Sequence, residues 1–259
     1  MTKIARSYKQ SDVDERWDAI VIGSGLGGLA SAALLSEQGK RALVLERHYA
    51  IGGFTHTFKR KGYEWDVGVH YIGEVHRERS VLGQLFRHIS GGALEWADMG
   101  EVYDRIMFGE VEYPLRKGVD NFKAGLREHF PDAADGRAID EYVNAVFAAS
   151  GSARGFYAEK AMSGVAGWIA APFMRRAHLA FTRKTTYEVL RGITDNTKLI
   201  GVLTGQYGDY GLPPKRSSFA MHASVAKHYF FGGNYPVGGS VRFAETIAPM
   251  IHAGGGLLL

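Results

Sequence analysis

The clearest pattern of apolar and polar positions lies near the start of the chain. Residues 17–22 form a short, mostly apolar run, which is typical of a buried parallel strand. Alanines and leucines from Leu26 to Leu35 then give a helix face, and Gly39 follows as a C-cap. Residues 41–45 form a second apolar run that ends on Glu46. The pattern therefore predicts a strand, a helix and a second strand in succession.

The pattern changes character in the middle of the chain. Residues 94–116 have the alternation of short strands, with a turn around Gly109 and Glu110. Residues 120–130 and 139–149 have the spacing of amphipathic helices. We expect these elements to form an α+β substrate domain inserted into the domain that holds the first strands.

One stretch, residues 162–174, is almost wholly apolar, and Arg175 and Arg176 follow it at once. It is too short to span a bilayer. One interpretation is a segment that dips into a lipid interface with its arginines at the headgroups, which predicts a peripheral membrane contact. The other interpretation is a buried core helix beside a substrate tunnel. The sequence does not choose between them.

The turn between the first strand and the helix carries the first candidate chemistry. Gly23, Ser24, Gly25 and Gly28 lie in a G-x-G-x-x-G arrangement, where the first glycine permits a tight turn, the second a close approach of a pyrophosphate, and the third close packing of helix on strand. The helix start favours phosphates. A tight turn in an unrelated α/β protein is the alternative, but the strands on both sides favour a dinucleotide site.

Glu46 is placed to accept hydrogen bonds from a ribose diol, because it ends the second strand. Its charge argues against a 2′-phosphate on that ribose, an argument that the neighbouring Arg47 weakens slightly. Gly52 and Gly53 come soon afterwards and suit a second close backbone approach to an extended cofactor, although a flexible turn would also use them. The first turn alone does not separate NAD from FAD.

Composition removes several functional classes. Hydrophobic residues make up 46% and charged residues 22%, which is ordinary for a globular protein, and a net charge of +4 gives no case for nucleic acid. Without cysteine, disulfides and thiolate catalysis are excluded. The spacing of His222 and His228 fits no zinc helix, so we expect no metal. The polar first residues lack a signal-peptide pattern, which makes a cytoplasmic setting the expectation.

Three segments resemble a known family. The first is the glycine turn with the paired glycines after Glu46, the second is GYEWDVGVHYIG at residues 62–73, which we expect to form a strand, and the third is residues 207–240 with their PVGG tetrad. The first two resemble the flavin-binding amine oxidase and phytoene desaturase superfamily. The third closely resembles retinol saturases and carotenoid isomerases and desaturases. Phe54 stands where that superfamily usually has an arginine after the paired glycines.

The resemblance implies a Rossmann-like α/β domain that binds FAD, formed by residues 15–75 and 235–259, with an inserted α+β substrate domain at residues 76–234. It implies an oxidoreductase that saturates, desaturates or isomerises C=C bonds of a hydrophobic polyisoprenoid, with NAD(P)H as one conceivable electron donor. After Asp66, Val67 and Gly68, it implies His70 and Tyr71 near the flavin. A non-catalytic remnant and an NAD-dependent dehydrogenase are the alternatives.

The end of the sequence adds one more expectation. Family members are roughly twice as long, and nothing here matches their late glycine–acid motif. The chain stops on Gly254 to Gly256 and three leucines, where a helix should have ended and a buried strand should begin. We expect an N-terminal part of a longer flavoenzyme, with an unpaired sheet edge and terminal leucines that have little to bury against.

Overall fold

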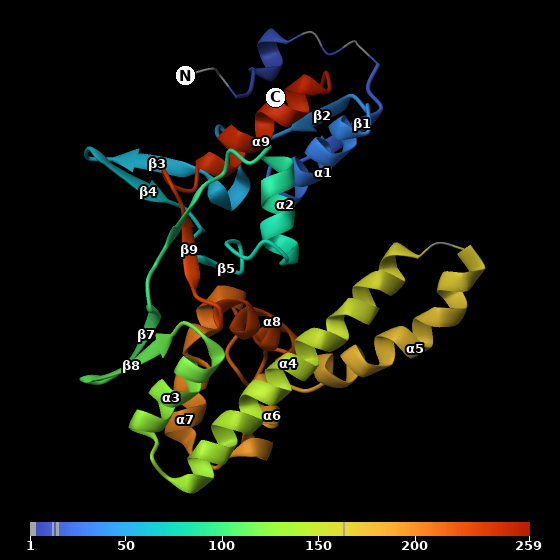
Figure 1. Cartoon of the computed structure of the whole chain (residues 1–259). Helices are drawn as coiled ribbons and strands as arrows, with labels where there is room; N and C mark the ends of the chain where they lie inside the picture. Colours follow the sequence, from blue (N-terminus) through green and yellow to red (C-terminus); the bar gives the residue numbers. More distant parts are fainter. Residues whose placement is uncertain (1–3, 12, 14–15, 163) are drawn as a thin grey trace. The chain divides into compact units, whose positions relative to one another are not determined.

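The chain folds into two units in the computed structural model, which describes residues 4–11, 13, 16–162 and 164–259 (Figure 1). The first unit comprises Met1–Asp98 and Asn234–Leu259, and the second comprises Met99–Gly233. The sequence assigned residues 76–98 to the inserted domain, whereas here they belong to the first unit. The reason is burial, since Phe86, Ile89 and Leu94 pack into the core of that unit.

The first unit contains a small parallel sheet with helices packed on it. Its elements are η1 (Tyr8–Gln10), β1 (Ala19–Ile22), α1 (Leu26–Glu37), β2 (Ala42–Leu45), η2 (Gly53–Thr55), β3 (Thr57–Arg60), β4 (Tyr63–Asp66), β5 (Ile72–Gly73), α2 (Val81–Ile89), β6 (Trp96–Asp98), β9 (Gly233–Pro236), α9 (Arg242–Ala253) and β10 (Leu257–Leu258). Strands β1, β2 and β10 are parallel neighbours in that order. The predicted strand–helix–strand start and the Rossmann-like α/β class are confirmed.

The core of the first unit forms where α1 and α9 pack together against β2 and β10. Leu29 of α1, Val44 of β2 and Ile247 of α9 have no exposed side-chain area. The strand expected after the last helix is present as β10, but the expectation that the terminal leucines have little to bury against is wrong. Leu258 pairs with Val44 and is fully buried, because β2 offers it a backbone ladder and α9 offers it an apolar face.

Strand β1 forms the edge of this sheet. Within the described part of the chain it pairs only with β2. Its side chains Ile20 and Ile22 are 62% and 88% exposed, although a Rossmann-like first strand is normally buried. The expected unpaired apolar edge is therefore present.

Residues 62–73 do not form one continuous strand. Strand β4 pairs antiparallel with β3, and the short β5 lies in a different sheet with the order β5–β9–β6. Between these two strands, the backbone at Gly68 is hydrogen-bonded to the loop that contains Gly52 and Gly53, not to a sheet. The Gly68 N–H donates to the carbonyl of Phe54 at 3.0 Å. Residues 62–73 therefore contribute a strand to each of two different sheets, and a loop joins the two strands.

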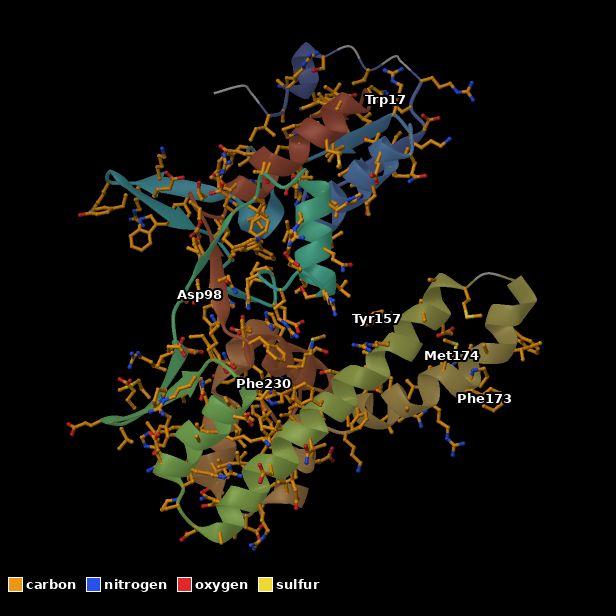
Figure 2. The ribbon with its side chains drawn as sticks, viewed as in Figure 1. Trp17, Asp98, Tyr157, Phe173, Met174 and Phe230 are labelled. Carbon is orange, nitrogen blue, oxygen red and sulfur yellow. The ribbon has the colours of Figure 1, made fainter. Side chains whose placement is uncertain are left out.

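The second unit is mainly helical. Its elements are β7 (Val102–Phe108), β8 (Val111–Arg116), α3 (Val119–His129), α4 (Ala133–Ala161), α5 (Gly164–Thr182), α6 (Thr186–Ile193), α7 (Thr197–Leu203), η3 (Gly205–Tyr210) and α8 (Phe219–Tyr229). The hairpin of β7 and β8 turns at Gly109, as predicted. Phe230 lies inside this unit (Figure 2). Its ring contacts those of Phe122 and Phe147.

The apolar stretch at residues 162–174 lies almost entirely in α5. Trp168 and Phe173 are 80% and 79% exposed. The interpretation of this stretch as a buried core helix is therefore wrong for these two large side chains. In the described residues, we find no helix with both the length and the apolar character needed to cross a membrane.

Candidate functional site

The glycine turn has the geometry that its three glycines predict. Gly23 has φ +94°, a conformation that residues with a side chain rarely adopt. A Cβ on Gly28 would lie 2.1 Å from the carbonyl oxygen of Gly23, so only glycine allows α1 to pack this closely on the turn. Around Gly25, by contrast, no atom lies within 4 Å of the place a Cβ would take. The backbone at Gly25 therefore faces open space.

Gly25 is also the N-cap residue of α1. It has no side chain that could accept hydrogen bonds from the first N–H groups of the helix, which need partners at every helix start. Open space, free N–H groups and the positive end of the helix dipole together make a cradle for a phosphate group.

Glu46 accepts hydrogen bonds from Ser24 and from the backbone that follows it at the end of β2. Its Oε2 accepts from the backbone N–H of Ser24 at 2.8 Å and from the Ser24 hydroxyl at 2.6 Å, and its Oε1 accepts from the His48 N–H at 2.8 Å. Desolvation raises the pKa of Glu46, but the hydrogen bonds from the Ser24 side chain and from the backbone of His48, Ser24 and Arg47 outweigh it and hold that pKa at about 2. The carboxylate is charged at neutral pH, and because Ser24 takes both acceptor positions of Oε2, Oε1 is the atom that can accept from a further donor.

Ser24 connects Glu46 to the second glycine loop. Its side chain is fully buried, and its hydroxyl donates to Glu46 while it accepts from the N–H of Gly52 at 3.0 Å. Both donors of Ser24, the N–H and the O–H, are therefore used inside the protein. The sequence proposed Ser24 as a cofactor contact, whereas these bonds make it a positioning residue in the structure.

The paired glycines pack directly on the nucleotide turn. A Cβ on Gly53 would lie 2.8 Å from the Cα of Gly25, and both Gly52 and Gly53 have positive φ angles, +121° and +58°. Gly25, Ser24, Gly52 and Gly53 thus form one continuous backbone surface. Arg47 is exposed beside it, and its backbone N–H is one of the groups that stabilise the Glu46 carboxylate.

The other two family-like segments are bound to each other. The Ser240 hydroxyl, in the residue after the PVGG tetrad, donates to Asp66 Oδ1 at 2.5 Å, and the Ser240 N–H donates to the same oxygen at 3.3 Å. The hydroxyl of Tyr235 donates to Asp66 Oδ2. The sequence identifies Asp66 only as part of a D-x-G segment and does not predict its partners. No local sequence signal links residues that are 174 positions apart.

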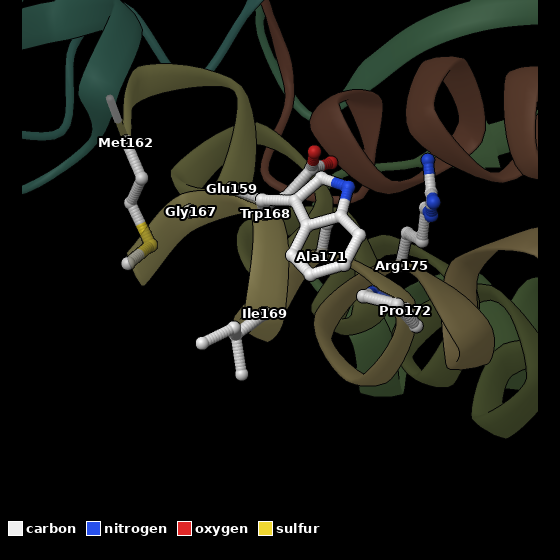
Figure 3. Close-up of a pocket in the computed structure, with 8 residues that line it drawn as sticks. All are labelled: Glu159, Met162, Gly167, Trp168, Ile169, Ala171, Pro172 and Arg175. Atoms are coloured by element: carbon white, nitrogen blue, oxygen red, sulfur yellow. The ribbon is translucent and has the colours of Figure 1, made fainter. Parts of the chain in front are cut away.

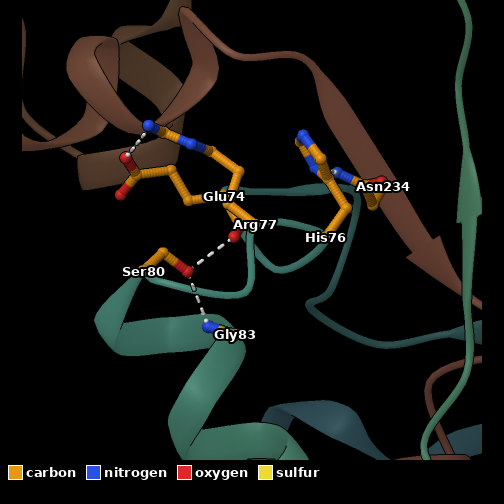
Figure 4. A network of polar contacts seen from close by, with 6 residues as sticks. All are labelled: Glu74, His76, Arg77, Ser80, Gly83 and Asn234. Atoms are coloured by element: carbon orange, nitrogen blue, oxygen red, sulfur yellow. Dashed lines mark hydrogen bonds and ion pairs between the residues drawn. The ribbon is translucent and has the colours of Figure 1, made fainter.

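A further polar network anchors the segment that follows β5 (Figure 4). Glu74 has a positive φ of +62° although it is not glycine, and its side chain accepts from Arg77 at 3.1 Å. Its carbonyl accepts from the Ser80 hydroxyl, which caps α2 by accepting from the Gly83 N–H. His76 Nδ1 lies 2.9 Å from the Asn234 amide nitrogen. These contacts hold the start of β9 beside the end of β5 and stabilise the unusual backbone at Glu74.

His70 and Tyr71, the two residues implied near a flavin, are neighbours in the loop before β5. Their rings meet edge to face with centroids 5.0 Å apart, and His70 is exposed. An exposed imidazole and a half-buried phenol could donate hydrogen bonds to a bound group. Their proximity to a flavin stays a prediction.

A separate buried cluster lies in the second unit. His222 is 2% exposed, with Nε2 at 2.9 Å from the Tyr142 hydroxyl and Nδ1 at 3.0 Å from the Tyr210 hydroxyl. Burial lowers the pKa of His222 to about 4, so the ring is neutral at pH 7, donating to one tyrosine and accepting from the other. In the part of the chain that the structure describes, no three histidine, aspartate or glutamate side chains gather as metal ligands would.

The residues of the first unit fit a dinucleotide. The open backbone at Gly25 leaves room for a pyrophosphate, and the Glu46 carboxylate offers acceptors for ribose hydroxyls. These features define a Rossmann-like nucleotide-binding unit. A family model described as an NAD(P)-binding Rossmann-like domain matches residues 21–104.

Comparison with known proteins identifies similar sequences. Human all-trans-retinol 13,14-reductase is 35% identical over 99% of this chain and 43% of its own length. A zebrafish (Danio rerio) protein named inactive all-trans-retinol 13,14-reductase is 32% identical over the same shares. Arabidopsis thaliana prolycopene isomerase is 45% identical over 23% of this chain and 10% of its own length. The chain is therefore similar to retinol 13,14-reductases over nearly its whole length, and to prolycopene isomerases over a shorter segment.

Solved structures support the fold at greater distance. An oxidoreductase from Methanosarcina mazei matches with a TM-score of 0.61 and 16% identity, covering 93% of this chain and 50% of the other. The chain therefore spans about half the length of the proteins that it resembles, both in sequence and in structure.

Proposed function

We propose that this chain is part of a flavin-dependent oxidoreductase acting on C=C bonds of a retinoid, carotenoid or other polyisoprenoid. The observation that carries the proposal is the contact of Gly53 with Gly25, which joins two glycine loops into one surface for an extended cofactor. Whole-chain similarity to retinol 13,14-reductases supports the substrate class. FAD fits an extended surface of this kind, and NAD(P)H is proposed as an electron donor.

The proposed roles of the residues follow from their contacts. Gly23, Gly25 and Gly28 form the phosphate cradle, and Glu46 accepts from the ribose. Ser24 aligns Glu46 with Gly52, while Gly52 and Gly53 let the cofactor approach the backbone. FAD, when bound, would supply the hydride chemistry, and His70 and Tyr71 would donate hydrogen bonds beside its ring. The protein contributes binding, orientation and exclusion of water.

The cofactor can be tested by titrating FAD into the purified 259-residue chain and measuring fluorescence quenching. Because the chain covers 43% of the length of the human relative, we expect it to bind FAD weakly by itself and to show no turnover. Glu46→Ala should weaken that binding further by about 1.5 to 3 kcal/mol, through the loss of charge-assisted hydrogen bonds. Glu37→Ala, at an exposed position at the end of α1, is the matched control and should leave FAD binding unchanged. Equal binding by the Glu46 and Glu37 variants would contradict the site.

Activity can be tested in a chimera in which this chain replaces the matching segment of human all-trans-retinol 13,14-reductase. The chimera would be offered retinol and a small carotenoid panel under anaerobic conditions, once with its flavin reduced, to detect saturation, and once with its flavin oxidised, to detect desaturation. A product heavier by two hydrogens indicates saturation, a lighter one desaturation, and a product of unchanged mass isomerisation. A soluble, flavin-loaded chimera that alters none of these compounds would contradict the proposal.

A non-catalytic relative is the second candidate, and one observation favours it. A protein whose name calls it inactive matches this chain at 32% identity over nearly its whole length. The two candidates differ in turnover by the flavin-loaded chimera. An NAD-dependent dehydrogenase would instead show NAD binding without flavin absorption.

A further inference from the structure

The paired helices α4 and α5 expose large apolar side chains at the end where the chain passes from one to the other. Tyr157 on α4 is 68% exposed, and Trp168, Ile169 and Phe173 on α5 are 80%, 58% and 79% exposed. Figure 2 labels Tyr157 and Phe173 on these helices. Within the second unit, the two helices run side by side, and this end projects beyond the other helices (Figure 1). We call these four side chains the hairpin tip.

Helix α5 directs its large apolar side chains away from α4, whereas a helix on the surface of a soluble protein normally packs such side chains against its neighbours. The residues that face α4 are small or polar, since Gly167, Ala171 and His178 are buried. The backbones approach closely, because a Cβ on Gly155 would lie 2.9 Å from the carbonyl oxygen of Met174. The Ser152 hydroxyl lies 3.1 Å from His178 Nδ1 and links the helices. Packing of the pair therefore does not need the large apolar residues, which point away from it.

The charge near the hairpin tip is positive. Residues 150–176 contain Arg154, Lys160, Arg175 and Arg176, with Glu159 as the single carboxylate. Lys160 lies 3.6 Å from Glu159 and offsets it. In the described part of the chain, Arg154, Arg175 and Arg176 form no ion pair. Their charges are available to an anionic surface.

A cavity of about 530 Å³, lined by both apolar and charged residues, lies between the ends of α4 and α5 (Figure 3). Met162, Trp168, Ile169 and Pro172 give it apolar walls, and both Glu159 and Arg175 line it as well. Figure 3 shows Ile169 reaching away from the ribbon. A recess with an arginine among apolar side chains suits the region where lipid headgroups meet acyl chains.

We infer that the hairpin tip docks on a bilayer that contains anionic lipids. Tryptophan favours the boundary between headgroups and hydrocarbon, and arginine can bury its stem there while its charge contacts phosphate. Four exposed apolar side chains would enter the interface, and the cations would add attraction to negative lipids. The inference does not depend on the proposed enzymatic function, because no cofactor or substrate enters the argument.

The test is cosedimentation of the 259-residue chain with vesicles of phosphatidylcholine, with and without phosphatidylserine. Trp168→Ser with Phe173→Ser should reduce binding to both vesicles at least tenfold, since two large apolar groups no longer leave water. Tyr63→Ser with Val81→Ser, at residues 69% and 80% exposed in the first unit, is the matched control and should bind as the unchanged chain does. Equal losses in both pairs would overturn the inference.

The charged residues give a second arm. Arg175→Gln with Arg176→Gln should weaken binding to phosphatidylserine vesicles about fivefold per charge and barely affect pure phosphatidylcholine. The chain has no cysteine, so Trp168→Cys carrying an environment-sensitive dye reports insertion directly. Its emission should shift to the blue on adding anionic vesicles, whereas dye at Val81→Cys should not shift. No shift at position 168, or self-association through the tip without vesicle binding, would overturn the inference.

Discussion

The hydroxyl of Ser24 lies 2.6 Å from Oε2 of Glu46 and receives a hydrogen bond from Gly52 on its other side. This one buried oxygen joins the end of the second strand to both glycine loops. The orientation of the Glu46 carboxylate and the position of the Gly52–Gly53 loop are therefore coupled. A change at Ser24 should affect both.

Ser24→Ala should destabilise the chain by about 1 to 3 kcal/mol, because the buried N–H of Gly52 loses its acceptor and Glu46 loses a donor. Urea unfolding followed by circular dichroism measures this. Ser31→Ala removes a similar hydroxyl on the exposed side of α1, where it donates to the Gly27 carbonyl, and should change stability by less than about 0.5 kcal/mol. Equal effects of the two changes would show that Ser24 has no special role.

Two glycines of the same turn should respond oppositely to alanine. Gly25→Ala should leave the free energy of unfolding nearly unchanged, since its Cβ meets open space at an ordinary φ, but it should weaken nucleotide binding. Gly28→Ala should destabilise the fold by roughly 2 kcal/mol or more, because the Cβ would overlap the Gly23 carbonyl. Thermal unfolding and FAD titration on both variants separate the two effects. Loss of folding in Gly25→Ala would contradict this assignment.

The stability of the second unit should fall between about pH 6.5 and pH 4. His222 has a folded-state pKa of about 4 against its ordinary value of 6.5, because burial disfavours its charged form. The unfolded chain then binds more protons in this window, so stability is present above pH 6.5 and decreases as pH falls, by up to about 3 kcal/mol. Urea unfolding at successive pH values measures the decrease.

His222→Gln should remove the part of this pH dependence that His222 causes, while keeping a donor and an acceptor between the two tyrosines. The contribution of Glu46 to the pH dependence lies lower, between about pH 4.5 and pH 2, because its pKa is depressed to about 2. An unchanged slope from pH 6.5 to 4.5 in the Gln variant would contradict the assignment to His222.

The exposed edge of β1 should limit the solubility of the isolated chain. Ile20→Thr with Ile22→Thr should lower the aggregated fraction and change the free energy of unfolding by less than about 1 kcal/mol, since both side chains already face water. Val44→Thr, in the neighbouring strand, is the control and should destabilise the chain, because a hydroxyl would enter the core. Light scattering and urea unfolding distinguish these outcomes. Increased aggregation in the double variant would contradict the prediction.

The sequence by itself determined the local elements around the nucleotide turn. The apolar run before Gly23, the helix after Gly25 and the strand ending at Glu46 are recognisable because strand and helix periodicity and glycine conformations act over a few residues. The same local signals predicted the β7–β8 hairpin and the helix before the terminal leucines.

Only the tertiary structure decided which distant groups meet. In the structure, the Ser240 hydroxyl donates to Asp66, and Leu258 is buried beside Val44. Residues 62–73 are divided between two sheets, and residues 76–98 belong to the first unit. The tertiary structure also turned Trp168 and Phe173 outward from α5, where the sequence left two interpretations open. The physical reason is that burial and hydrogen-bond partners depend on where the chain returns in space, and periodicity within one segment carries no record of that.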